Sequence, residues 1–325
     1  MNKINLRIIY MGTPDFAVEP LKLLVENNYN VVGVVTNPDK PAGRGQKLQE
    51  SAVKKYAISQ NLNILQPHKF RDESFLNELK ELNADLQIVV AFKMLPEVVW
   101  NMPRIGTFNL HASLLPQYRG AAPINWAIIN GESKTGVTTF FLKHEIDTGN
   151  IIFQEEVQIL EDDDAGSIHD KLMYKGANLV LKTVDSILTG NYPQLNQNIL
   201  VEAGTLIKHA PKIFKDDCKI NWNKDLNSIH NHIRGLSPYP AAWTEMVNNE
   251  EEIQIKIFKS EKESGNHNFT TGKIISDQKT HLKVAVKGGF VHLKELQLAG
   301  KKRLRVEDFL RGFQEINEYN FSTKV

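Results

Sequence analysis

Over the first 190 residues, short apolar runs alternate with amphipathic stretches, and this alternation restricts the fold more than any other feature of the chain. Continuous apolar runs occupy residues 6–11, 30–36 and 86–92, and helical patterns occupy 51–60 and 72–82. A run that is apolar at every position is typical of a strand buried on both faces, and strand–helix–strand units of this length form parallel sheets. We therefore predict an α/β fold with a doubly wound, Rossmann-like parallel sheet, whose ligands bind beyond the carboxyl ends of its strands.

The rest of this region is expected to complete the sheet. Residues 136–143 alternate in polarity and turn through 144–150 into an apolar run at 151–153, which predicts a hairpin at the sheet edge. A helix is expected over residues 167–188, and we interpret the Gly/Pro-rich segment after Leu110 as a turn.

After a polar stretch, interpreted as a linker over residues 191–207, the pattern changes. A helix predicted over 225–235 is followed by four runs of period 2, at 252–258, 271–275, 281–286 and 289–298. Short strands with charged outward positions favour a small antiparallel, OB-like β-barrel, and an open α+β domain is the alternative. The predicted organisation is a first domain over residues 1–190 and a second over 208–325.

The charge of the chain is balanced overall but not along its length. Its 325 residues include 39 Lys and Arg against 38 Asp and Glu, a net charge of +1 that on its own argues against a nucleic-acid partner. Residues 208–325, however, hold 20 basic and 15 acidic residues, whereas residues 1–207 hold 19 and 23. Such asymmetry can mark an appended domain that binds a polyanion.

Cysteine content and hydropathy indicate the cellular setting. Cys218 is the only cysteine, so the chain forms no internal disulfide and no cysteine zinc site. No stretch approaches the roughly 18 apolar residues of a membrane helix, and the first residues lead straight into a strand pattern without a signal-peptide region. We expect a cytoplasmic protein and a monomer.

Asn109-Leu110-His111 is the first candidate for chemistry. In an extended strand, residues two apart share a face, so Asn109 and His111 are expected to project together where the strand ends. An amide and an imidazole side by side donate hydrogen bonds to an oxygen that gains negative charge, which suits acyl transfer. Taken alone, the pair also fits a satisfied structural role.

Asp147-Thr148-Gly149 lies at the tip of the predicted hairpin and is the second candidate. Asp147 is placed to orient His111 and to favour its protonated form, and Gly149 is expected to supply a backbone conformation closed to other residues. An ordinary turn is the alternative. The same tripeptide occurs in aspartic proteases, but these need two such carboxylates and this chain has no second copy.

Together these elements resemble the folate-dependent formyltransferases, whose shared pattern is Asn-x-His, then Ser-Leu-Leu-Pro, then Asp-x-Gly. Residues 109–116 and 147–149 match it in order and spacing. Within that superfamily, the chain is similar over essentially its whole length to the methionyl-tRNA formyltransferases, whereas glycinamide ribonucleotide formyltransferases resemble only the first half. The segments that carry this likeness are MGTPDFAV at 11–18, NPDKPAGRGQKL at 37–48, SLLPQYRGAAPI at 113–124 and HNHIRGLSPYPAAWT at 230–244.

The resemblance implies an enzyme that transfers the formyl group of 10-formyltetrahydrofolate to the α-amine of methionyl initiator tRNA in translation initiation. It implies that Asn109 and protonated His111 stabilise the developing oxyanion and that Asp147 holds His111. The implied folate-binding residues are Ala91, Phe92, Lys93, Met94, Ser113, Leu114, Leu115 and Pro116. Where many relatives have an aromatic-Gly pair, this chain has Phe92-Lys93, which puts a bulky side chain at the expected rim of the folate pocket.

Two basic segments are candidates for tRNA binding. Residues 37–48 contain two prolines and two glycines, which favour an exposed loop carrying Lys40, Arg44 and Lys47. In the resembled family this loop lies against the acceptor stem, with Arg44 as its central basic residue. Lys301, Lys302 and Arg303 would add phosphate contacts from the second domain, and a solvated charged face is the alternative for both segments.

Other functions are less consistent with the sequence. A sugar-nucleotide N-formyltransferase would share the Asn-His-Asp centre but would not need the basic loop or the 230–244 segment, and a non-catalytic RNA-binding protein would not need intact Asn109, His111 and Asp147. A GxGxxG loop for NAD is missing, and the scattered histidines have no spacing that requires a metal.

Overall fold

The computed structural model describes residues 2–42, 47–201 and 206–324, which form two compact units. Unit 1 comprises Met1–Gly120, Thr135–Val157 and His169–His209. Unit 2 comprises Ala121–Lys134, Gln158–Ile168 and Ala210–Val325. Two short segments from the first half of the chain therefore fold with the C-terminal region.

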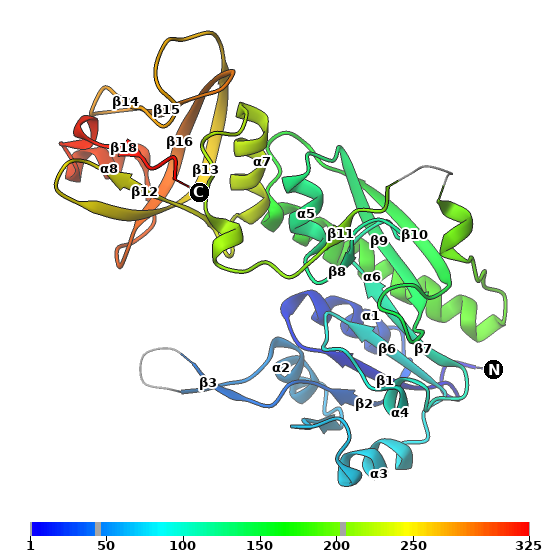
Figure 1. Cartoon of the computed structure of the whole chain (residues 1–325). Helices are drawn as coiled ribbons and strands as arrows, with labels where there is room; N and C mark the ends of the chain where they lie inside the picture. The colour runs from blue at the N-terminus through cyan, green and yellow to red at the C-terminus, as the bar shows by residue number, and fades with distance from the viewer. Residues whose placement is uncertain (1, 43–46, 202–205, 325) are drawn as a thin grey trace. The chain divides into compact units, whose positions relative to one another are not determined.

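Unit 1 is built on a sheet in which the predicted apolar runs are neighbours (Figure 1). The strand order is β10 (Ile151–Gln158), β9 (Lys134–Phe141), β7 (Gly106–His111), β6 (Leu86–Val90), β1 (Arg7–Gly12), β2 (Asn30–Val35), β5 (Ile64–Leu65). Strands from β7 to β5 run parallel, and β9 pairs antiparallel to β7. This confirms the doubly wound sheet with a hairpin at its edge. Because the chain goes from β1 to β2 on one side and later to β6 on the other, the carboxyl ends of β1 and β6 flank the point where ligands bind in such sheets.

Helices α2 (Ala52–Ser59), α3 (Glu73–Glu81) and α6 (Ala165–Thr189) lie where helices were predicted, although α6 begins within the residues assigned to unit 2. The other helices of unit 1 are η1 (Asp15–Ala17), α1 (Val18–Glu26), α4 (Glu97–Trp100) and the short η2 (Gln197–Leu200). Ser51 caps α2, because its hydroxyl accepts a hydrogen bond from the Lys54 N–H at 3.0 Å. The buried side chains of α3, such as Phe75 and Leu79, share a hydrophobic cluster with Ile9 and Val89 of the sheet.

In the segment predicted as an exposed loop at 37–48, the described residues include two short paired strands, which form a two-stranded ribbon. In it, β3 (Lys40–Ala42) pairs antiparallel with β4 (Lys47–Gln49). Its base is fixed by Asp39, whose carboxylate accepts hydrogen bonds from Lys54 at 2.5 Å and from Gln66 at 2.9 Å. For the paired residues the loop prediction was wrong, because main-chain pairing needs no apolar alternation, which was the sequence signal used for strands; the expected exposure holds at Lys40 and Pro41. Arg44 lies outside the described residues.

Unit 2 contains a barrel whose strands follow the order β14 (Ile274–Ser276), β15 (Leu282–Val286), β16 (Gly289–Leu298), β13 (Glu252–Ser264), β12 (Ala242–Val247), β18 (Asn320–Phe321). β17 (Leu304–Arg305) pairs with β16. A bridge between Lys273 and Asn320, with a 2.9 Å bond from the Phe321 N–H to the Gly272 carbonyl, joins the two edges. The barrel is therefore nearly closed, as predicted, and the open α+β alternative was wrong.

The remaining elements of unit 2 pack around that barrel or precede it. They are α5 (Pro123–Ile129), η3 (Asp216–Cys218), α7 (Leu226–Leu236), α8 (Val306–Gly312) and η4 (Ile316–Glu318). α5 falls where a turn was predicted; Pro123 suits the first position of a helix, where no N–H bond is lost. The core includes Trp222, whose indole donates to Thr244 at 2.9 Å and stacks on Phe321.

Two further short strands, β8 (Arg119–Gly120) and β11 (His209–Ala210), pair with each other in a separate two-stranded sheet. Within the described residues, no helix combines the length and the apolar character that crossing a bilayer requires.

Candidate active site

The carboxyl end of β7 carries Asn109 and His111, as predicted. Asn109 pairs with Val89 of β6 and Phe140 of β9, and His111 pairs with Thr138 of β9, so the backbone of both residues is fixed by neighbouring strands. His111 is the last residue of the strand and is only 6% exposed. The strand therefore holds an amide and an imidazole rigidly at the sheet edge where ligands bind.

The two ring nitrogens of His111 have different partners. Nε2 lies 2.9 Å from the main-chain carbonyl oxygen of Tyr118, and Nδ1 lies 3.9 Å from Oδ2 of Asp147. Because a carbonyl oxygen only accepts hydrogen bonds, Nε2 carries a proton in this contact. Nδ1 is therefore the nitrogen left for chemistry, and its separation from Asp147 exceeds a hydrogen bond.

The Ser113–Tyr118 loop presents the carbonyl that fixes His111. The Ser113 hydroxyl donates to the Gln117 carbonyl at 2.6 Å, and the Ser113 carbonyl accepts from the Thr138 hydroxyl at 2.6 Å. Leu115 is 2% exposed and packs with Phe140. Ser113 and Leu115 thus have a clear part in holding this loop, and contact of residues 113–116 with a folate stays a prediction.

The Asp147 turn is built differently from the sequence expectation. Asp147 itself, with φ of 56°, adopts the left-handed conformation that was expected of Gly149. Glycine is needed at 149 for another reason: a Cβ there would lie 1.6 Å from the Phe141 carbonyl oxygen. The carboxylate is fixed by the Gly120 N–H, which donates to Oδ2 at 2.9 Å.

Among the described residues, Asn109 Oδ1 is one of the few buried side-chain oxygens without a hydrogen-bond partner. Buried polar atoms are nearly always paired in folded proteins. An unpaired oxygen two residues from His111 therefore indicates capacity to bind a polar group of a ligand.

Sequence reasoning missed Gln197, which it placed in the linker. The side chain is buried, and its Nε2 donates to the carbonyl oxygens of Asp147 and Gly149. Its Oε1 accepts from Arg119. The polar surroundings of Gln197 in the sequence contain no signal for this role.

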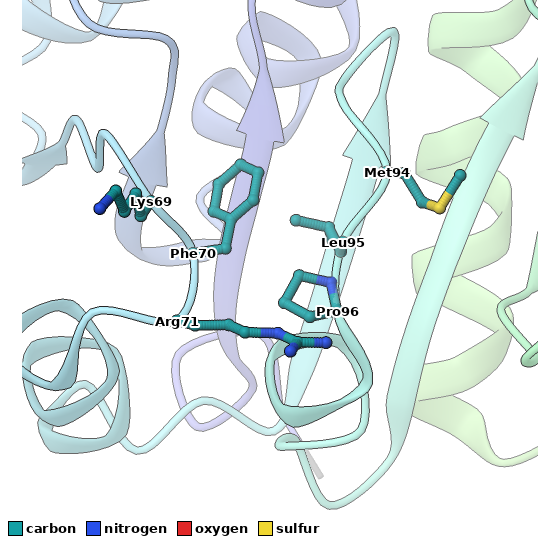
Figure 2. A pocket seen from close by; sticks show the side chains of 6 residues that line it. All are labelled: Lys69, Phe70, Arg71, Met94, Leu95 and Pro96. Carbon is teal, nitrogen blue, oxygen red and sulfur yellow. The ribbon is translucent and has the colours of Figure 1, made fainter.

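A pocket of about 410 Å³ lies beside the segment that follows β6 (Figure 2). Its lining residues are Lys69, Phe70, Arg71, Met94, Leu95 and Pro96. In Figure 2 the Arg71 side chain reaches from its own segment towards Leu95 and Pro96. Lys69 and Arg71 were not predicted; the available signal was their position shortly after β5, another strand whose carboxyl end meets this edge.

The predicted folate-binding residues 91–94 adjoin that pocket. Ala91 has φ of 45° and is exposed, and Met94 is 75% exposed. The Phe92 ring lies 5.7 Å from the Phe70 ring and packs against the core cluster, and Lys93 is exposed. Phe92 is thus partly accommodated by the protein interior, whereas the Lys93 side chain, which stands where many relatives have glycine, is exposed, and its effect on folate binding stays a prediction.

Comparison with known proteins now identifies the family. The model of the family described as Formyl transferase matches residues 5–184, and that described as Formyl transferase, C-terminal domain, matches residues 212–314. The chain belongs to the formyl transferase family. It is an enzyme of the formyltransferase class.

Individual formyl transferases are similar to this chain over nearly their whole length. A methionyl-tRNA formyltransferase of Parabacteroides distasonis is 60% identical, over 98% of this chain and 99% of the relative. That of Phocaeicola vulgatus is 61% identical, over 97% and 98%. A solved N-formyltransferase from Helicobacter canadensis, in complex with folinic acid and dTDP-3-aminofucose, superposes with a TM-score of 0.65 at 23% identity, over 90% of this chain and 99% of that one. The last likeness concerns the fold.

Beyond the formyl transferase centre, four of the predicted tRNA-binding residues are exposed: Lys40, Lys301, Lys302 and Arg303. Lys40 is exposed on β3, and Lys47 begins β4. Lys301 and Lys302 are exposed between β16 and β17. Arg303 differs from them, because its Nε donates to Glu295 at 2.6 Å and its guanidinium lies 4.4 Å from the centre of the Phe258 ring. No group of His, Cys, Asp and Glu suited to a metal ion occurs in the described part of the chain.

Proposed function

We propose that this protein transfers the formyl group of 10-formyltetrahydrofolate to the α-amino group of methionyl initiator tRNA. The observation that carries the proposal is its identity of 60% to a methionyl-tRNA formyltransferase over 98% of the chain. The proposal includes translation initiation as the process, the cytoplasm as the location and a monomer as the active form. It also keeps residues 1–190 as the catalytic region and 208–325 as the tRNA-binding region.

The residues around the pocket of Figure 2 fit part of a folate. A folate joins a flat pterin to an aromatic p-aminobenzoyl group and an anionic glutamate. Phe70, Leu95 and Pro96 supply apolar contacts for an aromatic ring, and Arg71 supplies a planar cation for a carboxylate. We propose that this pocket receives the p-aminobenzoyl-glutamate end, and that the exposed backbone of residues 91–94 with the 113–116 loop borders the pterin.

The chemistry assigned to Asn109 follows from its unpaired oxygen. Bound 10-formyltetrahydrofolate supplies a formyl carbon attached to nitrogen, as in an amide. Asn109 Oδ1 can accept a hydrogen bond from the attacking amine and so direct the nitrogen lone pair at that carbon. The amide NH₂ of the same side chain can donate to the formyl oxygen as it gains negative charge.

His111 is proposed to act through Nδ1, since Nε2 is bonded to the Tyr118 carbonyl. With a proton on Nδ1, the imidazolium donates to the developing oxyanion and then supplies a proton to the departing folate nitrogen. Asp147, 3.9 Å from Nδ1, stabilises that positive charge and takes a proton from the amine through a water molecule. A new carbon–nitrogen bond to methionine forms as the bond between the formyl carbon and the folate nitrogen breaks. The methionine nitrogen loses one proton and the folate nitrogen gains one.

For tRNA, we propose phosphate contacts by Lys40, Arg44 and Lys47 of residues 37–48 and by Lys301 and Lys302 of unit 2. Lys40, Lys301 and Lys302 are exposed, as phosphate contacts require. Arg303 is included as a weaker contributor, because a phosphate would compete with its existing bond to Glu295.

The test is a competition between acceptors. The purified protein and 10-formyltetrahydrofolate are incubated with methionyl initiator tRNA and a dTDP-amino sugar together, and the two initial rates give the ratio of kcat/KM. We expect kcat/KM for the tRNA to exceed that for the amino sugar by more than about 1000-fold, because sites that form hydrogen bonds with one substrate and not with another discriminate at least this strongly. Preferential formylation of the amino sugar would contradict the proposal.

A further inference from the structure

Gln197 lies on η2, far along the chain from the other residues around His111, and is 1% exposed. Its Nε2 donates to the carbonyl oxygen of Asp147 at 2.7 Å and to that of Gly149 at 2.9 Å. Its Oε1 accepts from Nε and Nη2 of Arg119 at 3.0 and 2.6 Å. Both amide hydrogens and two acceptor positions are therefore used, so this side chain has a single well-defined arrangement.

The residues bonded to Gln197 belong to the two loops that contact His111. Tyr118, just before Arg119, supplies the carbonyl for Nε2, and Gly120, just after it, donates to the Asp147 carboxylate. That carboxylate faces Nδ1. One amide thus connects the loop that fixes one ring nitrogen to the turn that carries the carboxylate opposite the other.

The backbone of both loops needs such support. Tyr118 and Asp147 have φ of 61° and 56°, in the left-handed region that side chains other than glycine seldom adopt. Residues persist in this region when surrounding contacts over-determine their conformation, and such residues are concentrated at functional sites. Without Gln197, the Asp147 and Gly149 carbonyls would lose their donor and the turn would be free to relax.

We propose that Gln197 is a positioning residue for the reaction: it fixes the Asp147 carboxylate opposite Nδ1 of His111 by bonding both loops at once. This inference rests on the proposed function, because it takes Asp147 as part of the catalytic centre. It also means that the segment predicted as a linker completes the active site, although none of its atoms needs to touch a substrate.

A merely structural role is separated from this one by a double-mutant cycle. Gln197→Leu should lower kcat for methionyl initiator tRNA by at least about tenfold, since misplacement by 1 Å can cost about 100-fold. KM for the tRNA should be unchanged. In a D147N background the same substitution should cause no further loss of kcat, because the carboxylate that Gln197 positions is gone.

The matched control is Asn198→Ala on the same short helix, where the side chain is exposed and kcat should stay at the wild-type value.

Two results would overturn the inference. If Q197L multiplied the loss in D147N by the same factor as in the wild type, Gln197 would act through the fold in general and not through Asp147. If D147N itself had wild-type kcat, the catalytic assignment of Asp147 under the proposed function would fail first, which is a distinct outcome.

A second variant covers the case in which Q197L does not fold. Gln197→Glu has the same shape and keeps the bond from Arg119, but it no longer donates to the Asp147 and Gly149 carbonyls. We expect the same loss of kcat as for Q197L, and the ion pair with Arg119 should keep the variant folded although its carboxylate faces two carbonyl oxygens. Wild-type kcat in Q197E would contradict the proposal.

Discussion

Replacing Gly149 with alanine should disable the enzyme by moving Asp147. The added methyl would lie 1.6 Å from the Phe141 carbonyl oxygen, about 1.8 Å short of the 3.4 Å at which ordinary contact begins. Neither side can give way cheaply, because the methyl is attached directly to the backbone Cα, the oxygen it meets belongs to the backbone, and the Phe141 N–H donates to the Asn150 carbonyl at 3.0 Å. The turn must therefore shift, and Asp147 lies within it.

The size of the effect follows from that displacement. A shift of about 1 Å in a positioned group can reduce the rate about 100-fold, so we expect kcat of Gly149→Ala to fall at least that much. Forcing a methyl into a packed site typically costs about 1–3 kcal/mol of stability, so the variant should still fold.

The assay is steady-state formylation of methionyl initiator tRNA, with unfolding followed by circular dichroism. Gly265→Ala is the matched control, because a Cβ there meets nothing within 4 Å, and it should have wild-type kcat and stability. A folded Gly149→Ala variant with wild-type kcat would refute the claim that this close approach sets the position of Asp147.

Three further predictions follow from the site, the ribbon and unit 2. His111→Ala should lower kcat at least about 100-fold with little change in tRNA affinity, as expected when a contact is specific to the transition state, and near-normal turnover would exclude His111 from its role. Arg44→Ala should weaken tRNA binding in a filter assay and leave folate binding unchanged; an unchanged tRNA affinity would contradict the tRNA-binding role proposed for residues 37–48. Burial, with the charges of Arg234 and Lys262, lowers the pKa of His230 to about 4. Protonation therefore opposes folding, so the free energy of unfolding should be constant above about pH 6.5 and fall as the pH decreases towards 4. Denaturant titrations of His230→Gln should lack that part of the decrease, and an unchanged pH dependence would contradict the burial argument.

The strands and helices of unit 1 could be predicted because their signals are local. Runs such as those of β1 and β6 are apolar at nearly every position, because the sheet buries both of their faces. The hairpin of β9 and β10 was equally readable from alternation. The ribbon of β3 and β4 was not, because its stability comes from main-chain pairing and from the anchoring of Asp39 by Lys54 and Gln66, contacts between residues far apart in the sequence.

The candidate site was predicted in its residues and only partly in its geometry. Asn-x-His on a strand fixes which side chains share a face, so Asn109 and His111 could be placed together. Which nitrogen of His111 is free depends on the Tyr118 carbonyl, and that is decided by tertiary packing. The contacts of Gln197 form because the chain after α6 comes back to the Asp147 turn. No local sequence pattern predicts that long-range contact.

The interleaving of the two units illustrates the same limit. Residues 121–134 and 158–168 belong with the C-terminal unit although they lie among the residues of the first. Composition and periodicity describe stretches of chain, whereas compact units are defined by contacts between stretches.

The central claim is tested most directly by mass analysis of the acceptor. The protein is incubated with 10-formyltetrahydrofolate and methionyl initiator tRNA, and H111A is treated in parallel. The ester that joins methionine to the tRNA is then hydrolysed, and the mass of the released methionine is measured by mass spectrometry. We expect the wild-type protein to add to methionine the mass of one carbonyl group, CO, and H111A to add almost none in the same time. An unmodified methionine with the wild-type protein, under conditions in which it binds the tRNA, would contradict the account.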